Sequence, residues 1–414
     1  MEIFHIILYN LIAVNLILCG YEQYENHFSI FFNRERTTKK EDNFGDEIIY
    51  KLLFNNIFTS IKLGNNQKHL NILLTFNNSN IKLTLPSFDQ KKQLIEKDKF
   101  IFPRANKELN LYYNINTNEK IDNNSYIGLS LYENDNNKYS FINQLKENKI
   151  IEKRIFSVLY KEQSIIDDEI FDGQILFGLY PHNMTYRYKE YDLNWISILD
   201  NKWKIKFDEI KYNNNEILNI NEIEFDIGIN LIIGPEEYRI KLYNNYLKNY
   251  IDKKICKEEV FYHKKDNQFY LAYSCKSNII FENFPTLNIY KKELNYSIII
   301  GSEQLLCVYY GRTYFKIVFK KKGENKKWIF GRTFMEVYPL VFDLDNKKIG
   351  FYKIKISGDY YIFVSIFLSS IFIIILMAYF RGLNILKNEK LNKEKNEKDY
   401  NDINSNEKSK LKDE

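Results

Sequence analysis

The sequence predicts a mostly β protein, long enough for two lobes, followed by one membrane-spanning helix near the C-terminus. At 414 residues the chain is long enough to bury a large core and to divide into two lobes. Aromatic residues make up 16% of it, with 33 Tyr and 31 Phe against only 15 Gly and 6 Pro. This composition suits strands better than disorder. Residues 361–380 carry no charge and are long enough to span a bilayer.

The N-terminus indicates entry into the secretory pathway. Residues 3–19 form an apolar run that stops at a Cys-Gly pair before polar residues, which predicts a signal peptide over residues 1–20. Glu2 stands where such peptides usually carry a basic residue. An uncleaved N-terminal anchor is therefore the alternative.

The C-terminus predicts how the protein crosses the membrane. The uncharged run is flanked by tyrosines at its ends, and Arg381 and two lysines follow. A buried core helix is the weaker alternative for this run. We expect a single-pass type I protein of a secretory-pathway membrane or the cell surface, with a lumenal or extracellular body. Residues 381–414 mix charged residues and Asn, which predicts a disordered cytosolic tail.

A stretch in the middle of the chain, EIEFDIGINLIIGP at residues 222–235, carries the most informative pattern. A short apolar approach leads to Asp226 and Gly228, and an apolar run then ends at Gly-Pro. Such a pattern is typical of a strand, a tight loop and a second strand. A carboxylate in this setting costs free energy to bury unless it is hydrogen-bonded or does chemistry. An Asp that only closes a turn is the alternative.

This stretch resembles the second catalytic loop of the pepsin-like aspartic proteases, in which Asp-Thr-Gly-Thr/Ser precedes an apolar run and Gly-Pro. Other blocks follow in the family's order. Residues 126–132 and 141–160 resemble the first lobe's glycine turn, helix and strand. Residues 172–178 and 195–211 resemble the crossover between the lobes, and residues 328–351 resemble the closing segment. The resemblance implies an all-β, bilobal pepsin-like fold, with lobes over residues 47–180 and 181–357.

The first lobe departs from the family where its own catalytic aspartate belongs. Residues 76–80, FNNSN, match the family's Phe-Asp-Thr-Gly-Ser, so that Asn77 stands at the aspartate and Ser79 at the glycine. The family mechanism needs two carboxylates that share one proton, and an amide cannot cycle a proton. The resemblance therefore implies a site in which Asp226 is the only catalytic carboxylate.

Further departures surround this expected site. Ile227 and Ile229, on either side of Gly228, replace residues whose hydroxyls hydrogen-bond across the dyad in the family. No glycine occurs in residues 65–127, where the family carries a glycine-tipped flap with a tyrosine. We expect at most a remnant of that flap, with Tyr113 or the tyrosine before it near the cleft.

The resemblance extends to the cysteines and to the N-terminal segment. The family's second-lobe disulfide flanks a Leu-Pro strand as Cys275 and Cys307 flank residues 284–290, which implies that pair and leaves Cys256 unassigned. Residues 21–46 are polar and basic but short for a family prosegment, and we interpret this pro-like segment as a linker or a vestige.

Glycosylation sequons provide a further set of candidate sites. One of them falls at Asn77, where the fold should be buried. Three others are candidates for glycans on surface loops: Asn123, Asn183 and Asn295.

Other chemistries find little support in the sequence. The five histidines are isolated and show no metal-ligand spacing, and neither a Gly-x-Ser-x-Gly elbow nor a phosphate loop occurs, so we expect no metal and no cofactor. The net charge of +5 comes from scattered lysines and not from a basic cluster interleaved with aromatics, which argues against nucleic-acid binding.

The sequence therefore predicts a membrane-anchored aspartic peptidase homologue that is inactive and binds a peptide or partner protein in its interlobe cleft. One alternative is an active membrane-bound aspartic endopeptidase that hydrolyses peptide bonds with Asp226 and an unusual partner group. A purely structural surface protein is the third class.

Overall fold

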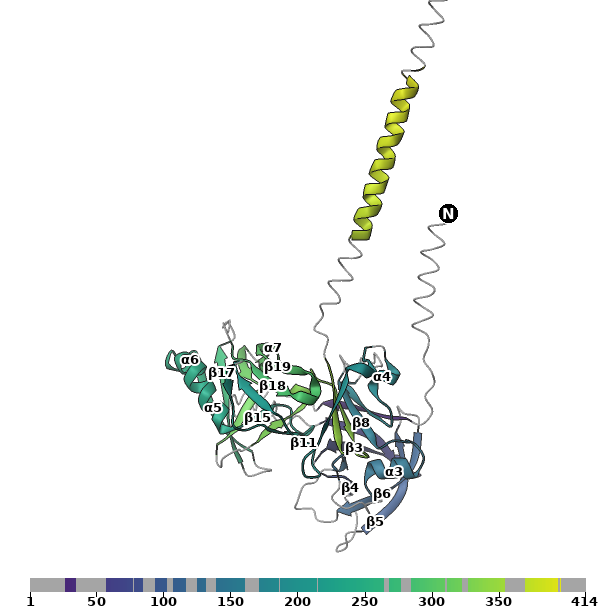
Figure 1. Ribbon diagram of the computed structural model, residues 1–414. Coiled ribbons are helices and arrows are strands. Elements are labelled where there is room, and N and C mark those ends of the chain that lie inside the picture. Colours follow the sequence, from purple (N-terminus) through teal and green to yellow (C-terminus); the bar gives the residue numbers. More distant parts are fainter. Residues whose placement is uncertain are drawn as a thin grey trace, which may run out of the picture. The chain divides into compact units, whose positions relative to one another are not determined.

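The chain divides into two compact units, Met1–Lys353 and Ile354–Glu414 (Figure 1). The expected signal peptide lies outside the residues that the structure describes. This structure is a computed structural model, and the residues that it describes are 27–34, 57–76, 78–84, 94–102, 107–116, 125–131, 139–160, 171–185, 187–213, 215–263, 268–276, 284–309, 311–321, 327–353, 369–393 and 395.

The largest sheet in the described part of the first unit has 12 strands and combines segments from both ends of that unit. We refer to β2–β7 as the first lobe. From one edge to the other the strands are β10 (Leu193–Ser197), β25 (Lys348–Tyr352), β24 (Leu340–Asp343), β8 (Ile155–Tyr160), β9 (Gly173–Phe177), β1 (Phe28–Arg34), β2 (Ile57–Leu63), β3 (Lys68–Thr75), β7 (Tyr126–Gly128), β4 (Ile81–Thr84), β6 (Lys107–Asn116) and β5 (Leu94–Phe102).

Strand β1 lies within residues 21–46, which we expected to form a linker or a vestigial prosegment. Phe28, Ile30 and Phe32 are all buried, and their alternation has the period of a strand with one face in the core. The strand pairs with β9, beginning with Phe28 opposite Phe177, and with β2 on its other side. This part of the segment is therefore built into the sheet.

Two further sheets are formed between residues 204 and 330, and we refer to them as the second lobe. One has nine strands: β11 (Lys204–Lys206), β14 (Glu222–Phe225), β23 (Trp328–Phe330), β15 (Ile232–Gly234), β22 (Ile317–Lys320), β17 (Gln268–Lys276), β21 (Arg312–Phe315) and β20 (Leu306–Tyr309), with β16 (Cys256–His263) beside β17. The other has four: β13 (Glu216–Ile217), β12 (Glu209–Tyr212), β18 (Leu287–Lys291) and β19 (Tyr296–Ile300).

The described helices of this unit are short. They are α3 (Phe141–Glu147), α4 (Pro181–Met184), η2 (Glu190–Asp192), α5 (Glu236–Leu242), η3 (Tyr243–Leu247), α6 (Lys248–Asp252), η4 (Lys292–Leu294), α7 (Ser302–Leu305) and α8 (Arg332–Met335). Most of the buried apolar side chains belong to one core cluster that contains residues of both lobes. The strand-rich unit fits a pepsin-like fold.

The two lobes repeat one arrangement of four strands. In the first lobe β7 is parallel to β3 and antiparallel to β4, and β4 is parallel to β6. In the second lobe β23 is parallel to β14 and antiparallel to β15, and β15 is parallel to β22. A Cβ on Gly128 would lie 2.1 Å from the carbonyl oxygen of Asn78, and one on Gly331 would lie 2.2 Å from that of Ile229. Both repeats therefore require glycine at this place.

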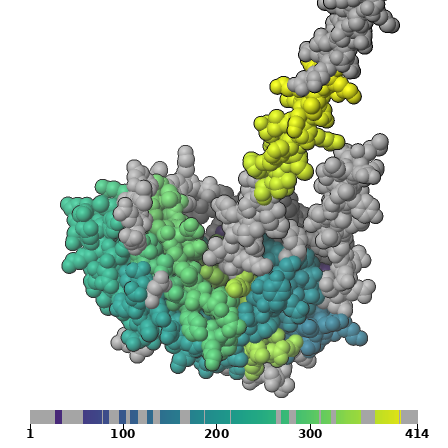
Figure 2. All heavy atoms as spheres, turned by 45° about the horizontal axis from the view of Figure 1, so that its top comes forward, coloured from purple at the N-terminus to yellow at the C-terminus, as the bar shows by residue number. Residues whose placement is uncertain are grey.

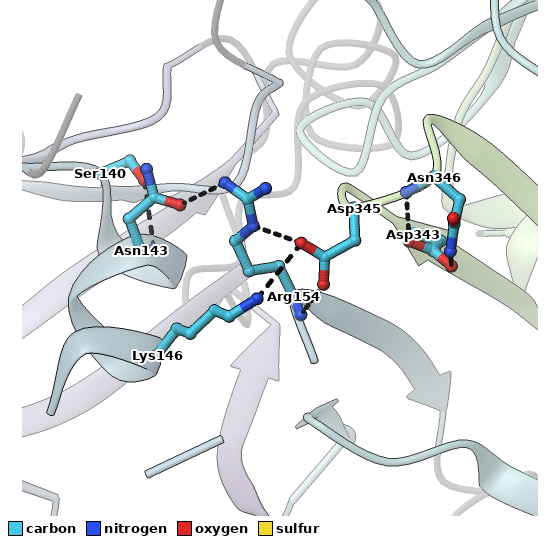
Figure 3. Close-up of polar contacts among 7 residues, drawn as sticks. All are labelled: Ser140, Asn143, Lys146, Arg154, Asp343, Asp345 and Asn346. Atoms are coloured by element: carbon cyan, nitrogen blue, oxygen red, sulfur yellow. Dashed lines mark hydrogen bonds and ion pairs between the residues drawn. The ribbon is translucent and has the colours of Figure 1, made fainter. Parts of the chain in front are cut away.

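The hairpin of β24 and β25 is tied to helix α3 and to the start of β8 by polar contacts (Figure 3). Arg154 donates through Nε to Asp345 Oδ1 at 2.6 Å and through its backbone N–H to Oδ2 at 2.8 Å. Arg154 also donates to Asn143 Oδ1 at 3.0 Å, and Lys146 lies 3.5 Å from Asp345. In the space-filling view the yellow-green residues of this hairpin lie beside blue and teal residues (Figure 2).

The second unit contains the helix Ser369–Lys393, which is long and apolar enough to cross a membrane. Of the span expected over residues 361–380, residues 361–368 lie outside the described part. The helix continues beyond Phe380, so the first part of the tail that we expected to be disordered is helical. After Gly382 this part contains only Leu, Ile, Asn, Lys and Glu, without a further Gly or Pro, and an existing helix propagates through such residues.

Candidate functional site

Asp226 lies where β14 ends, in a loop held by backbone contacts. Its N–H donates to the carbonyl oxygen of Phe330 at 3.1 Å, and its Oδ1 accepts the N–H of Gly228 at 2.8 Å. The side chain is buried, with 9% of the residue exposed. A Cβ on Gly228 would lie 3.1 Å from this Oδ1, so a glycine lets the backbone approach the carboxylate closely.

The surroundings of Asp226 favour its neutral form. Burial raises the pKa of its carboxyl to about 6, and the hydrogen bond from Gly228 opposes this shift. Glu224 raises the pKa further, while Arg332 and Lys327 lower it. Glu224 and Lys327 form an ion pair with each other. A group with this pKa changes its protonation state between acid and neutral pH, as a proton donor or acceptor must.

Arg332, the first residue of α8, is fully buried beside this loop, and the sequence analysis missed it. Its N–H donates to the carbonyl oxygen of Ile229 at 2.8 Å. Burial lowers the pKa of its guanidinium to about 10, and Tyr160, Glu336 and Asp226 oppose this by attraction. The signal was an arginine directly after a glycine inside the apolar run WIFGRTFM.

The two isoleucines next to Gly228 face apolar surroundings. Ile227 is completely buried and belongs to the large core cluster. Ile229 is partly buried and packs against a second cluster that contains Leu231 and Ile233. The loop of Asp226 therefore carries apolar side chains where the family resemblance led us to look for hydroxyls.

The first-lobe residues of the expected site are only partly described. Asn77 lies outside the described residues. Ser79 is buried, its carbonyl oxygen accepts the N–H of Phe141 at 3.0 Å, and its hydroxyl lies 3.4 Å from Asn80 Oδ1. These contacts attach Ser79 to the start of α3.

Tyr113, our candidate for a tyrosine of a remnant flap, lies in a hairpin of the first lobe. It belongs to β6 and is buried in the β5–β6 hairpin, with its ring edge-on to Phe100 at a centroid distance of 5.7 Å. Its hydroxyl donates to Glu96 Oε2 at 3.1 Å. Burial and this carboxylate raise the pKa of Tyr113. The alternation of buried residues along β6 places Tyr113 in the first-lobe core.

The disulfide joins Cys256 to Cys275, so the expected Cys275–Cys307 pair is wrong. Cys256 and Cys275 lie opposite each other in the β16–β17 hairpin, with their Cα atoms 4.0 Å apart. Cys307 is a free thiol on β20. Because β21 lies between β17 and β20, Cys307 is two strands from Cys275, about 9–10 Å, which is too far for a disulfide.

The glycosylation candidates lie in different settings. Asn123 is outside the described residues. Asn183 is half-buried in α4. Asn295 is exposed, directly follows η4 and adopts a left-handed backbone conformation with a φ of 58°.

Comparison with known proteins identifies the family. The family model for eukaryotic aspartyl protease matches residues 104–354, a range that contains Asp226 and Arg332 but begins after the first-lobe residues 75–84. No curated protein matches the chain. The matched range covers more than half of the chain, and it contains the buried carboxylate loop and the strand arrangement of the second lobe. This chain belongs to the eukaryotic aspartyl protease family.

Proposed function

We propose that this protein is a non-hydrolytic member of the aspartyl protease family that binds a peptide or a partner protein at the site of Asp226. One observation carries the proposal. The second-lobe loop holds a buried carboxylate, whereas residues 75–80 of the first lobe read TFNNSN and contain no carboxylate. Because none of these six residues carries a carboxylate, the conclusion does not depend on which of them lies nearest to Asp226.

The chemistry of the reaction explains why one carboxylate is insufficient. Peptide hydrolysis of this type needs an ionised carboxylate that takes a proton from water and a protonated one that polarises the scissile carbonyl. Asp226 can serve in either role near its pKa of about 6, but not in both at once. Loss of one general acid or base costs about 10²–10⁴-fold in rate. The apolar Ile227 and Ile229 next to Asp226 also support the proposal.

Membrane anchoring is part of the same proposal. The helix Ser369–Lys393 supports a single span that holds the body at a membrane surface. The disulfide Cys256–Cys275 supports an oxidising compartment for that body. Protease added to sealed microsomes should remove only residues after the span. Digestion of the body under those conditions would contradict this topology.

The catalytic part is tested with the full-length chain in detergent. We expect no hydrolysis of a broad peptide library between pH 3 and 7 above the level of an Asp226→Asn variant. Turnover that is blocked by a statine inhibitor and lost in that variant would overturn the proposal in favour of an active endopeptidase.

Binding is measured separately, by selecting displayed peptides on the same detergent-solubilised chain. The matched control is Asp226→Arg, which puts a larger side chain of opposite charge into the site. Selected peptides should lose binding to this variant. Peptides that bind both proteins equally would argue against the Asp226 site.

A further inference from the structure

The strand registers of the two repeats identify the first-lobe residue that corresponds to Asp226. In the parallel pair β3–β7, Thr75 is opposite Gly128. In the parallel pair β14–β23, Phe225 is opposite the residue before Gly331, so that Asp226 is level with Gly331. If the two glycines hold the same place in their repeats, Thr75 corresponds to Asp226.

Two contacts support the equivalence of the two glycines. The N–H of Gly128 donates to the carbonyl oxygen of Asn80 at 3.0 Å, and the N–H of Gly331 donates to that of Leu231 at 3.1 Å. The residues that follow these two acceptors also pair alike. Ile81 is antiparallel to Ile127, and Ile232 is antiparallel to Phe330, so each partner directly precedes its glycine. Asn80 and Leu231 are therefore equivalent, and counting back five residues from each reaches Thr75 and Asp226.

Burial follows the same correspondence. Leu74 and Phe225, which precede the two positions, are each 2% exposed. Phe76 and Ile227, which follow them, are buried in the same core cluster. The residues on either side of the two positions are thus buried in both lobes.

Trp203 joins the ends of the two strands. Its carbonyl oxygen accepts the N–H of Phe225 at 2.8 Å, and its indole N–H donates to the carbonyl oxygen of Leu129 at 2.9 Å. The N–H of Leu129 in turn donates to the carbonyl oxygen of Thr75 at 2.8 Å. One buried tryptophan is therefore linked directly to Phe225 and, through Leu129, to Thr75, which brings the two equivalent positions into one region of the protein.

We infer that Thr75, and not Asn77, holds the first-lobe position that corresponds to Asp226, so that the site combines one hydroxyl with one carboxylate. This inference rests on the proposed loss of the second carboxylate and identifies the residue that replaces it. Assignment by motif placed the position two residues too far along the chain, because FNNSN shares its phenylalanine with the family pattern. A threonine hydroxyl donates one hydrogen bond and accepts two without adding charge, so it does not repel an ionised Asp226.

The test places a second carboxylate at each candidate position and observes Asp226 by NMR titration of its carboxyl carbon in the full-length chain. In Thr75→Asp, two carboxylates at equivalent positions should titrate as a coupled pair, and the midpoint of Asp226 should move by about one pH unit or more. In the matched variant Asn77→Asp, the midpoint should move by less than half as much.

A second, uncharged pair of variants covers the case in which Thr75→Asp does not fold. Thr75→Val keeps the shape and removes the hydroxyl, so the midpoint of Asp226 should move upward, whereas Asn77→Ala should leave it in place. A larger movement from the variants at Asn77, or no movement from either variant at Thr75, would overturn the inference. These readouts do not depend on hydrolysis, so failure of the inference is distinguishable from failure of the proposed function.

Discussion

The loops that follow β3 and β14 have similar backbone arrangements and different chemistry. Each lies after a strand that runs parallel to its neighbour. Each also passes close to a glycine, where an added methyl group would clash with the loop backbone. The second-lobe loop carries a buried carboxylate, with Arg332 packed beside it. The first-lobe loop carries neutral polar residues from Asn78 to Asn80.

This difference separates what the fold requires from what the reaction requires. The close glycine contacts and the strand registers are needed for the two lobes to pack, because the backbone is buried there. The carboxylate, the neighbouring hydroxyls and the flap are needed only for hydrolysis. In this chain the first set occurs in both lobes and the second only in part, which agrees with the proposed non-hydrolytic function.

The largest effect is expected where the two loops are alike. Gly128→Ala and Gly331→Ala should each lower the free energy of unfolding by about 3 kcal/mol or more, since the added methyl group would lie within 2.5 Å of a backbone oxygen. Denaturant unfolding measures this. Gly301→Ala is the control, because the nearest atom there lies 3.7 Å away, and its cost should stay below about 1 kcal/mol. A large loss at only one of the two glycines would break the equivalence of the lobes.

A smaller effect should distinguish the loops by their charge. Burial raises the pKa of Asp226 from 3.8 to about 6, so its contribution to stability is fully present below pH 4 and is lost as the pH rises through 6. The shift of about two pH units corresponds to about 3 kcal/mol at most. Asp226→Asn should therefore gain stability relative to the wild type between pH 4 and 7, as measured by unfolding at each pH. Parallel stability curves for the two proteins would show that Asp226 is not desolvated.

The second-lobe site was predictable from sequence because its signal is local. Asp226, Gly228 and the apolar run that follows lie within a few residues, and a strand, loop and strand are their usual structure. The first-lobe site depends on which residue is level with Gly128. That register is set by pairing between strands about 50 residues apart. The five-residue motif alone does not fix the register, and it placed the catalytic position two residues away from Thr75.

Two other differences have the same origin. The pairing of Cys275 depends on β16 lying beside β17, and the sequence showed β16 only as a mixed charged and aromatic segment. Arg332 reads as a surface residue by type, yet Tyr160 and Asp226 act on its charge from distant parts of the chain. Charged residues in the core are predicted poorly because their partners come from tertiary contacts.

The smallest expected effect concerns a second aspartate, whose pH dependence has the opposite sign to that of Asp226. Partial burial alone would raise the pKa of Asp345, but its hydrogen bonds from Arg154 and the charge of Lys146 outweigh this and lower the pKa below its usual value of 3.8. Its contribution is therefore present above pH 4 and is lost as the pH falls further. Asp345→Asn should lower the free energy of unfolding by about 0.5–1 kcal/mol at pH 7, since the pair is partly exposed, and the difference should be smaller at pH 3 than at pH 7. Urea unfolding at both pH values measures this.

The control is the double variant that combines Arg154→Gln with Asp345→Asn. Because the two residues interact directly, the double variant should lose less stability than the two single variants together. Full additivity would mean that this ion pair does not stabilise the contact between the hairpin of β24 and β25 and the α3–β8 segment.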